Sequence, residues 1–301
     1  MKTGRIGRGL TIALIALVGV GAAGCMLLEA KERELLYRPM RDYGRTPADM
    51  GIAFEEVWID VTREGGEGNE RVHAWWLPSG KPGAPAVLYL HGIRWSLGSN
   101  LFRIARWREL GFNVLAIDYR GFGRSDGDLP SEVQIYADAR AAWNELAKRE
   151  PNPELRFIYG HSLGAAVALE LAANVDNAAG VIAEAGFTSV ADIIAESYAP
   201  LNLLVSQKFD ALARAKLLKA PVLFMHGTAD RYVPPAMSEK LFAAAPQPKK
   251  LHLIEGANHG NWNGAGLDDY KRVVLEFVRT ARDYSAAKLR RSVTPKPALS
   301  S

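Results

Sequence analysis

The chain has 301 residues, 48% of them hydrophobic and 23% charged, which is enough for one large globular domain with a sizeable core. Its net charge is +4, but Lys2, Arg5 and Arg8 precede the first apolar run, and no basic stripe interleaved with aromatic residues follows, so we expect no nucleic-acid partner. The single cysteine, Cys25, excludes an intrachain disulfide and a cysteine-based metal site.

Residues 1–25 have the pattern of a secretion or membrane-attachment segment. Three basic residues precede Leu10–Leu28, a stretch of 19 residues without a charge. As a helix this stretch could span the ~30 Å apolar core of a bilayer. The ending Ala22-Ala23-Gly24-Cys25 resembles a bacterial lipobox, in which cleavage before the cysteine precedes its lipidation, although Ala22 stands where leucine is usual. We therefore expect a lipoprotein modified at Cys25, an uncleaved signal anchor or, as the third alternative, plain secretion.

Either of the first two alternatives would attach the protein to a membrane through its N-terminus. The positive-inside rule then leaves the bulk of the chain on the non-cytoplasmic side, so we expect a location in the bacterial cell envelope. Residues 26–50 are expected to be a linker that packs onto the domain, and residues 285–301 a flexible basic tail.

Between these ends, residues 51–284 alternate between strand and helix patterns. Two strand patterns, 54–62 and 71–78, flank a Gly-rich loop and should pair antiparallel. Six short apolar runs of the kind that a parallel sheet buries on both faces follow, at 86–90, 113–118, 156–159, 180–185, 221–225 and 249–254. Helical patterns lie at 97–110, 131–149, 163–175, 189–198, 237–245 and 268–283. The sequence therefore predicts an α/β domain with an eight-stranded, mostly parallel sheet and helices on both faces.

The run Gly160-His161-Ser162-Leu163-Gly164 ends one of these strands and begins a helix. Gly-x-Ser-x-Gly between a strand and a helix is the nucleophile elbow, whose small flanking residues let the strand and the helix approach closely. Ser162 would then stand at a helix N-terminus, which favours negative charge. We expect Ser162 to be a nucleophile, and the backbone N–H of Leu163 to be an oxyanion donor. A tight turn with Ser162 as an ordinary helix cap is the alternative.

A serine hydroxyl needs a base, and the base needs an orienting acid; with this elbow they follow in the order acid, then histidine. His259, in the Gly- and Asn-rich loop after the last strand, is the expected general base, whereas His252 lies inside that strand. Asp230, a short turn after the strand at 221–225, is the expected acid. Glu184 remains a rival acid, because some hydrolases place it one strand earlier.

The second oxyanion donor should come from the loop after the third strand, where Ile93 is our choice and Arg94 the next. No carboxylate and histidine cluster suggests a metal, and no G-x-G-x-x-G opens a helix. We therefore expect neither a metal nor another cofactor.

The segments LYLHGIRWSLGSN, AIDYRGFGRSDG, YGHSLGAAVA, PVLFMHGTADRYVP and GANHGNW together resemble the α/β-hydrolase fold family. Within it the chain looks like the compact serine aminopeptidase-like and bud-emergence-type branch, which includes membrane-associated acyl hydrolases and depalmitoylating enzymes. The resemblance covers about residues 51–284. Where relatives often have a small Asn-Gly-rich run, this chain has Ile93-Arg94-Trp95, whose bulk would narrow an acyl pocket.

The run 187–218 is too short for a large cap, so we expect a minimal cap of one or two short helices. We expect the apolar residues Leu201, Leu203, Leu204 and Val205 to pack on the domain, with contact to an apolar substrate as the alternative.

These features predict a serine hydrolase that cleaves carboxylic esters or thioesters through an acyl-enzyme. An aminopeptidase on the same fold is the first alternative; it would need an acidic group near the site to hold the substrate's amine, and only Glu184 and Asp126 are candidates. A non-catalytic binding protein on a hydrolase scaffold is the second alternative. The fold by itself names no substrate.

Overall fold

The computed structural model describes residues 24, 26–63, 68–260 and 265–293. Its central sheet contains β2 (Glu55–Thr62), β3 (Asn69–Leu77), β4 (Ala86–Leu90), β6 (Asn113–Ile117), β7 (Arg156–His161), β8 (Gly180–Glu184), β9 (Val222–Gly227) and β10 (Lys249–Ile254). The α-helices after residue 100 are α2 (Leu101–Glu109), α3 (Glu132–Arg149), α4 (Leu163–Asn174), α5 (Val190–Tyr198), α6 (Ala211–Ala215), α7 (Pro235–Ala244) and α8 (Ala265–Val293). The short elements are β1 (Arg38–Pro39), β5 (Arg94–Trp95), η1 (Pro47–Met50), η2 (Leu97–Asn100), η3 (Pro153–Leu155) and η4 (Leu201–Leu204).

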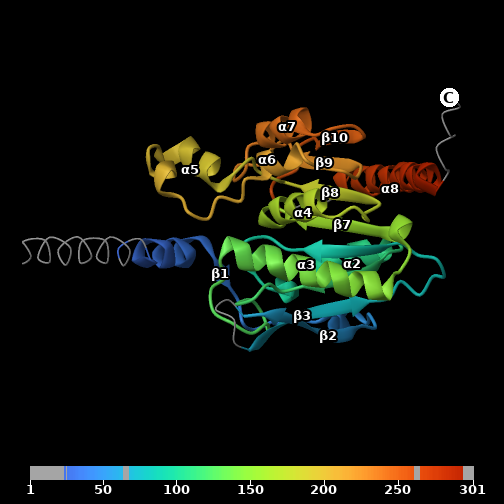
Figure 1. The fold of residues 1–301 in the computed structure, drawn as a ribbon, viewed down its shortest axis with the longest axis horizontal. Helices are drawn as coiled ribbons and strands as arrows, with labels where there is room; N and C mark the ends of the chain where they lie inside the picture. Colours follow the sequence, from blue (N-terminus) through green and yellow to red (C-terminus); the bar gives the residue numbers. More distant parts are fainter. Residues whose placement is uncertain (1–23, 25, 64–67, 261–264, 294–301) are drawn as a thin grey trace, which may run out of the picture.

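The eight strands form one sheet in the order β10-β9-β8-β7-β4-β6-β3-β2 (Figure 1). Strand β3 runs antiparallel to both of its neighbours, and every other pairing is parallel. Strands β4, β7 and β8 are buried along their whole length, which explains the apolar residues in their centres. Strand β2, at the edge, alternates buried and exposed residues along most of its length. The expected α/β sheet is confirmed.

Helices cover both faces of the sheet and divide the core into two clusters. Buried residues of α3, α4, α6 and α7 pack on one face, and those of α2 and α8 on the other. Helix α4 lies deepest, with almost every residue buried, which is why its sequence is apolar on all sides. This packing fixes the start of α4, where Ser162 lies, against the sheet.

The segment before the first long strand is a packed part of the domain. Residues 26–36 are helical, and Tyr37 and Tyr43 beyond them are buried. The Tyr43 hydroxyl lies 2.7 Å from Nδ1 of His73 on β3, and β1 pairs with β5 in a separate two-stranded sheet. Residues 37–43 are therefore held against the domain by these contacts.

Most of the predicted attachment segment, residues 1–23 with Cys25, lies outside the described residues, so the expectations about lipidation and signal type stay predictions. Within the part of the chain that the structure describes, no helix combines the length and the apolar character needed to cross a membrane.

The C-terminal end differs from the expectation of a flexible tail from residue 285. Helix α8 continues to Val293, because residues 284–293 are rich in strong helix formers and the next proline is Pro295. Lys288 also donates a hydrogen bond to the carbonyl of Lys219. Residues 294–301 lie outside the described part.

The cap also differs from the expectation, in the burial of its leucines. The run 187–218 contains three short helical elements, α5, η4 and α6, and the buried residues of α6 pack into the core. Leu203 and Leu204, however, are 80% and 73% exposed rather than packed on the domain, and only Val205 packs against the core cluster. None of the residues of η4 is buried, although this element lies beside α5.

Candidate active site

Ser162 lies in the turn between β7 and α4. Its backbone adopts φ 57° and ψ −118°, a region that residues with a Cβ rarely occupy, so the turn is strained. A Cβ at Gly160 would collide with the backbone of Gly164, and one at Gly164 would collide with the carbonyl of Leu90. The two glycines are therefore required by close packing, and the serine between them is held at the end of the sheet.

The side chains of Ser162, His259 and Asp230 form a continuous hydrogen-bonded chain. Nε2 of His259 lies 3.1 Å from Oγ of Ser162, and Nδ1 of His259 lies 2.7 Å from Oδ2 of Asp230. An ionised carboxylate can only accept, so Nδ1–H donates to Asp230 and Nε2 is left to accept from the serine hydroxyl. The structure thus brings together the three residues predicted from sequence, from three different loops.

Asp230 is held as a carboxylate by its neighbours. Its Oδ1 accepts hydrogen bonds from the backbone N–H groups of Tyr232 (2.8 Å) and Val233 (3.0 Å). Burial by itself would raise the pKa of Asp230, but the hydrogen bonds from His226 and His259 outweigh it and hold the pKa well below its usual value. Asp230 is therefore ionised at any physiological pH.

His226 is a site residue that sequence reasoning missed. Its Nε2 lies 3.0 Å from Oδ2 of Asp230, and its Nδ1 lies 2.6 Å from Oγ of Ser238. Because the carboxylate must accept, Nε2–H donates to Asp230 while Nδ1 accepts from the Ser238 hydroxyl. The signal was present in the sequence, since the histidine comes four residues before the acid in HGTAD.

Glu184, the rival acid, is occupied elsewhere. Its Oε1 lies 2.5 Å from Nη1 of Arg103, and its Oε2 accepts a hydrogen bond of 2.6 Å from the hydroxyl of Tyr159. The other terminal nitrogen of Arg103 donates to the carbonyl of Gly260 at 2.8 Å. Arg103 therefore binds the carboxylate of the rival acid, and it is Asp230 that contacts the imidazole of His259.

His161 supports the same loop from the strand side. Its Nε2 lies 2.8 Å from the carbonyl oxygen of His259, so the ring donates from that nitrogen. Burial, together with the nearby positive charge of Arg103 and the ring of His259, holds the pKa of His161 well below its usual value. The imidazole of His161 is therefore neutral in the folded protein.

Both predicted oxyanion residues lie beside the serine. Leu163 is the first residue of α4, so its N–H belongs to the first turn, whose donors have no acceptor within the helix. A Cβ on Gly92 would come within 3.4 Å of the Cβ of Ser162, which places the loop carrying Ile93 against the elbow. The roles of Leu163 and Ile93 as donors stay predictions.

The bulk predicted to narrow an acyl pocket is arranged differently. Ile93 is half-buried and packs against the core. Arg94 and Trp95 form β5, which pairs with β1, and the Trp95 side chain is 53% exposed. Both residues of β5 are exposed, and they pair with the N-terminal segment through their backbone.

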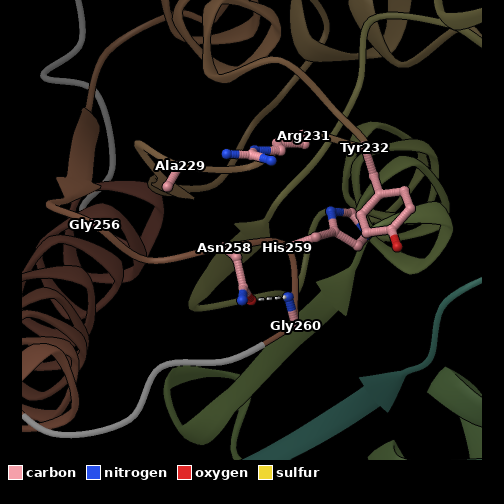
Figure 2. A pocket seen from close by; sticks show the side chains of 7 residues that line it. All are labelled: Ala229, Arg231, Tyr232, Gly256, Asn258, His259 and Gly260. Carbon is pink, nitrogen blue, oxygen red and sulfur yellow. Dashed lines mark hydrogen bonds between the residues drawn. The ribbon is translucent and has the colours of Figure 1, made fainter.

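A pocket of about 510 Å³ opens beside His259. Figure 2 shows Arg231 lying across it, with the Tyr232 ring next to the imidazole of His259. It is lined by Ala229, Arg231, Tyr232, Gly256, Asn258, His259 and Gly260. Asn258 accepts a hydrogen bond from the N–H of Gly260 at 3.0 Å, which stiffens the pocket wall (Figure 2). In the described ranges, no three His, Cys, Asp or Glu side chains are grouped as metal ligands.

Comparison with known proteins identifies the family of the chain. A family model described as "Serine aminopeptidase, S33" matches residues 82–211 and 204–264. The chain is an α/β hydrolase and belongs to this serine aminopeptidase S33 family.

Its relatives extend over most of the chain. An uncharacterized protein of Mycobacterium tuberculosis, Rv2307c, is 35% identical over 272 residues, covering 89% of this chain and 92% of its own. The α/β hydrolase domain-containing protein WAV2 of Arabidopsis thaliana is 28% identical and covers 86% and 91%. The protein bem46 of Schizosaccharomyces pombe is 33% identical and covers 64% and 67%. The resemblance to the bud-emergence-type branch is thereby confirmed.

Among solved structures, the esterase Pf2001 of Pyrococcus furiosus superposes with a TM-score of 0.65 at 23% identity, covering 81% of this chain and 98% of that one. A puromycin-hydrolyzing peptidase of Mycobacterium tuberculosis superposes with a TM-score of 0.59 at 18% identity, covering 75% and 39%. At these identities the likeness shows a shared fold.

Proposed function

We propose that this protein is a serine hydrolase that cleaves carboxylic esters or thioesters. The hydrogen-bonded chain from Ser162 through His259 to Asp230, at a strained strand-to-helix turn, carries the proposal. It is the arrangement that activates a serine hydroxyl for attack on an acyl group. The shared fold with an archaeal esterase adds support.

In the proposed reaction, Oγ of Ser162 attacks the acyl carbon while Nε2 of His259 takes the hydroxyl proton. His259 then gives this proton to the leaving oxygen or sulfur, and the alcohol or thiol departs from an acyl-serine. Water attacks the acyl-serine while His259 takes its proton. His259 then returns this proton to Oγ of Ser162 as the bond between Oγ and the acyl carbon breaks and the acid is released. Asp230 holds the tautomer of His259 and stabilises the imidazolium. The N–H groups of Leu163 and Ile93 would hold the oxyanion, and one such donor is typically worth about 3 kcal/mol.

The family name suggests an aminopeptidase as the second candidate. Such an enzyme needs a carboxylate at the site to hold the substrate's amino group. The two acids considered for this role have structural partners instead: Glu184 binds Arg103 and Tyr159, and Asp126 accepts a hydrogen bond of 2.9 Å from the N–H of Arg71 on β3. These contacts favour an ester or thioester over a peptide substrate.

We further propose that the N-terminus attaches the protein to the bacterial cell envelope, with the hydrolase domain on the non-cytoplasmic side. The basic start and the uncharged stretch Leu10–Leu28 support this, through either lipidation of Cys25 or an uncleaved anchor.

Labelling with a fluorophosphonate probe tests the proposed function. The probe should modify the wild-type chain and leave Ser162→Ala unmodified, because only an activated serine reacts. Rates on p-nitrophenyl esters, an acyl-coenzyme A thioester and an aminoacyl amide would then separate the substrate classes. Absence of labelling in folded wild-type protein would favour the non-catalytic reading, and faster cleavage of the amide would favour the peptidase.

A further inference from the structure

The cap carries an exposed apolar surface that no described part of the chain covers. Its members are Tyr198, Leu201, Leu203 and Leu204, which we call the cap patch, and each is more than half exposed. The surrounding sequence, residues 197–207, contains no charged side chain. Leucines clustered in this way on a surface mark a contact with something apolar.

The cap patch lies next to the N-terminal helix. The Glu32 carboxylate accepts hydrogen bonds from the N–H groups of Ser206 (3.0 Å) and Gln207 (3.0 Å), the residues that follow η4. Figure 1 shows the blue N-terminal helix and the yellow α5 region projecting from the same end of the molecule. The helix also exposes apolar side chains at Met26, Leu27 and Leu28, where it meets the uncharged stretch that begins at Leu10.

The cap patch also lies on the active-site side of the sheet. The cap follows β8, whose last residue Glu184 pairs with His161 at the end of β7. The carbonyl of Glu184 accepts a hydrogen bond of 2.9 Å from the N–H of Ser162. The cap, the N-terminal helix and the serine therefore belong to one end of the fold.

We propose that the cap patch rests on a lipid surface, so that the substrate is an acyl ester or thioester taken from the membrane. The substrate class rests on the proposed function, whereas the lipid contact stands on its own. Glu32 ties the cap to the helix that follows the apolar N-terminal stretch in the sequence, and attachment through that stretch would hold the leucines at the bilayer at a high effective concentration. Burial of their apolar area then favours the contact. We favour a lipid surface over a second copy of the chain as the occupant of the cap patch, because a second copy would have no such connection to the N-terminal stretch.

The lipid contact can be measured without any enzymatic activity. Full-length Cys25→Ser protein, which keeps the apolar stretch, is given a single new thiol by Leu203→Cys or by Leu275→Cys, and that thiol carries an environment-sensitive fluorophore. Leu275 is a matched control because it is an exposed leucine (47%) on α8, a helix on the opposite side of the molecule from α5 (Figure 1).

Both labelled proteins are reconstituted into phosphatidylethanolamine and phosphatidylglycerol vesicles and quenched with iodide. Residue 203 should emit at shorter wavelength and be quenched several-fold less than residue 275. Equal quenching at the two positions would overturn the lipid contact. So would protection of residue 203 that rises with the ratio of protein to lipid, because a second copy would then cover the patch.

The substrate class is tested by activity on two esters, a water-soluble short-chain ester and a long-chain ester dissolved in the same vesicles. Leu203→Glu should lower the vesicle rate by about tenfold and leave the soluble rate unchanged, while Leu275→Glu changes neither. If the ratio of the vesicle rate to the soluble rate is the same in Leu203→Glu and Leu275→Glu, the inference about the substrate is overturned. If the wild type cleaves neither ester, the proposed function fails, and the quenching comparison still decides the lipid contact.

Discussion

Arg103 and Glu184 form a buried ion pair, with 2.5 Å between Nη1 and Oε1, and the same guanidinium donates to the carbonyl of Gly260, the residue after His259. Helix α2, the end of β8 and the histidine loop are thus joined through one side chain. The position of the His259 imidazole therefore depends on a charge pair that is separate from the hydrogen-bonded chain of Ser162, His259 and Asp230.

Replacing Arg103 by Gln is expected to destabilise the fold and slow the reaction. The Glu184 carboxylate would lose its countercharge in a buried site, which typically costs about 3–5 kcal/mol. The Gly260 carbonyl would lose a charged donor, so kcat should fall with little change in KM. Chemical denaturation and steady-state kinetics measure the two effects.

The double variant Arg103→Met with Glu184→Met separates these two roles. Removing both charges should restore most of the stability, since no buried charge is left behind. The rate should stay low, because Gly260 still lacks its donor. Recovery of the rate together with the stability would show that Arg103 serves the fold alone.

The backbone strain at Ser162 predicts a difference between two inactive variants. Both Ser162→Ala and Ser162→Gly remove the nucleophile, but only glycine adopts a φ of 57° without steric cost. Relief of such strain is worth about 1–3 kcal/mol, part of which the greater freedom of glycine in the unfolded chain offsets. Ser162→Gly should therefore be the more stable by about 1 kcal/mol in urea denaturation. Equal stability would mean that the strain relieved at the turn is no larger than the entropic cost of glycine, and a less stable Ser162→Gly would contradict the prediction.

The hydrogen bond from His226 predicts a pH-dependent effect on stability. His226→Gln should lower the free energy of unfolding at neutral pH by about 1.5–3 kcal/mol, the usual value for a hydrogen bond to a charged group. The lowered pKa of Asp230 stabilises the fold above the ordinary carboxyl pKa, and this contribution is lost as the pH falls from there through the folded value. The difference between wild type and variant should therefore shrink in acid. If the difference in the free energy of unfolding between wild type and His226→Gln does not change with pH, His226 contributes through packing only.

His161 predicts a loss of stability that begins at a higher pH than the loss caused by Asp230. Its pKa is lowered in the folded protein, so below about pH 6.5 the unfolded chain binds a proton that the folded chain does not. Stability should fall with decreasing pH from there, by up to about 1.4 kcal/mol per pH unit from this group. His161→Gln should remove that contribution. NMR titration should find the His161 ring still neutral when an ordinary histidine is half protonated.

The triad could be predicted because its members follow strand ends. Parallel strands bring their carboxyl ends to one edge, so Ser162, Asp230 and His259 meet there although they are far apart in sequence. Arg103 could not be recognised in the same way. In a helical pattern it resembles a solvent-facing charge, and its partner Glu184 is 81 residues away.

The exposure of Leu203 was also beyond the sequence. An apolar run predicts burial but does not say against what, and η4 projects past the core that would have received it. The extension of α8 has a simpler explanation: basic residues at a chain end suggest a frayed tail, but Lys and Arg are also good helix formers.

The pairing of β1 with β5 has a practical consequence for how this hydrolase is produced. Arg38 and Pro39 lie alongside Arg94 and Trp95, one residue beyond the expected oxyanion donor. A protein trimmed to residue 51 would lose this ladder and would expose Trp75, against which the Tyr43 ring packs at 5.0 Å. A fragment that begins before Tyr37 retains both contacts. The first residue of a secreted or soluble form therefore determines whether the loop that carries Ile93 keeps the support of β1.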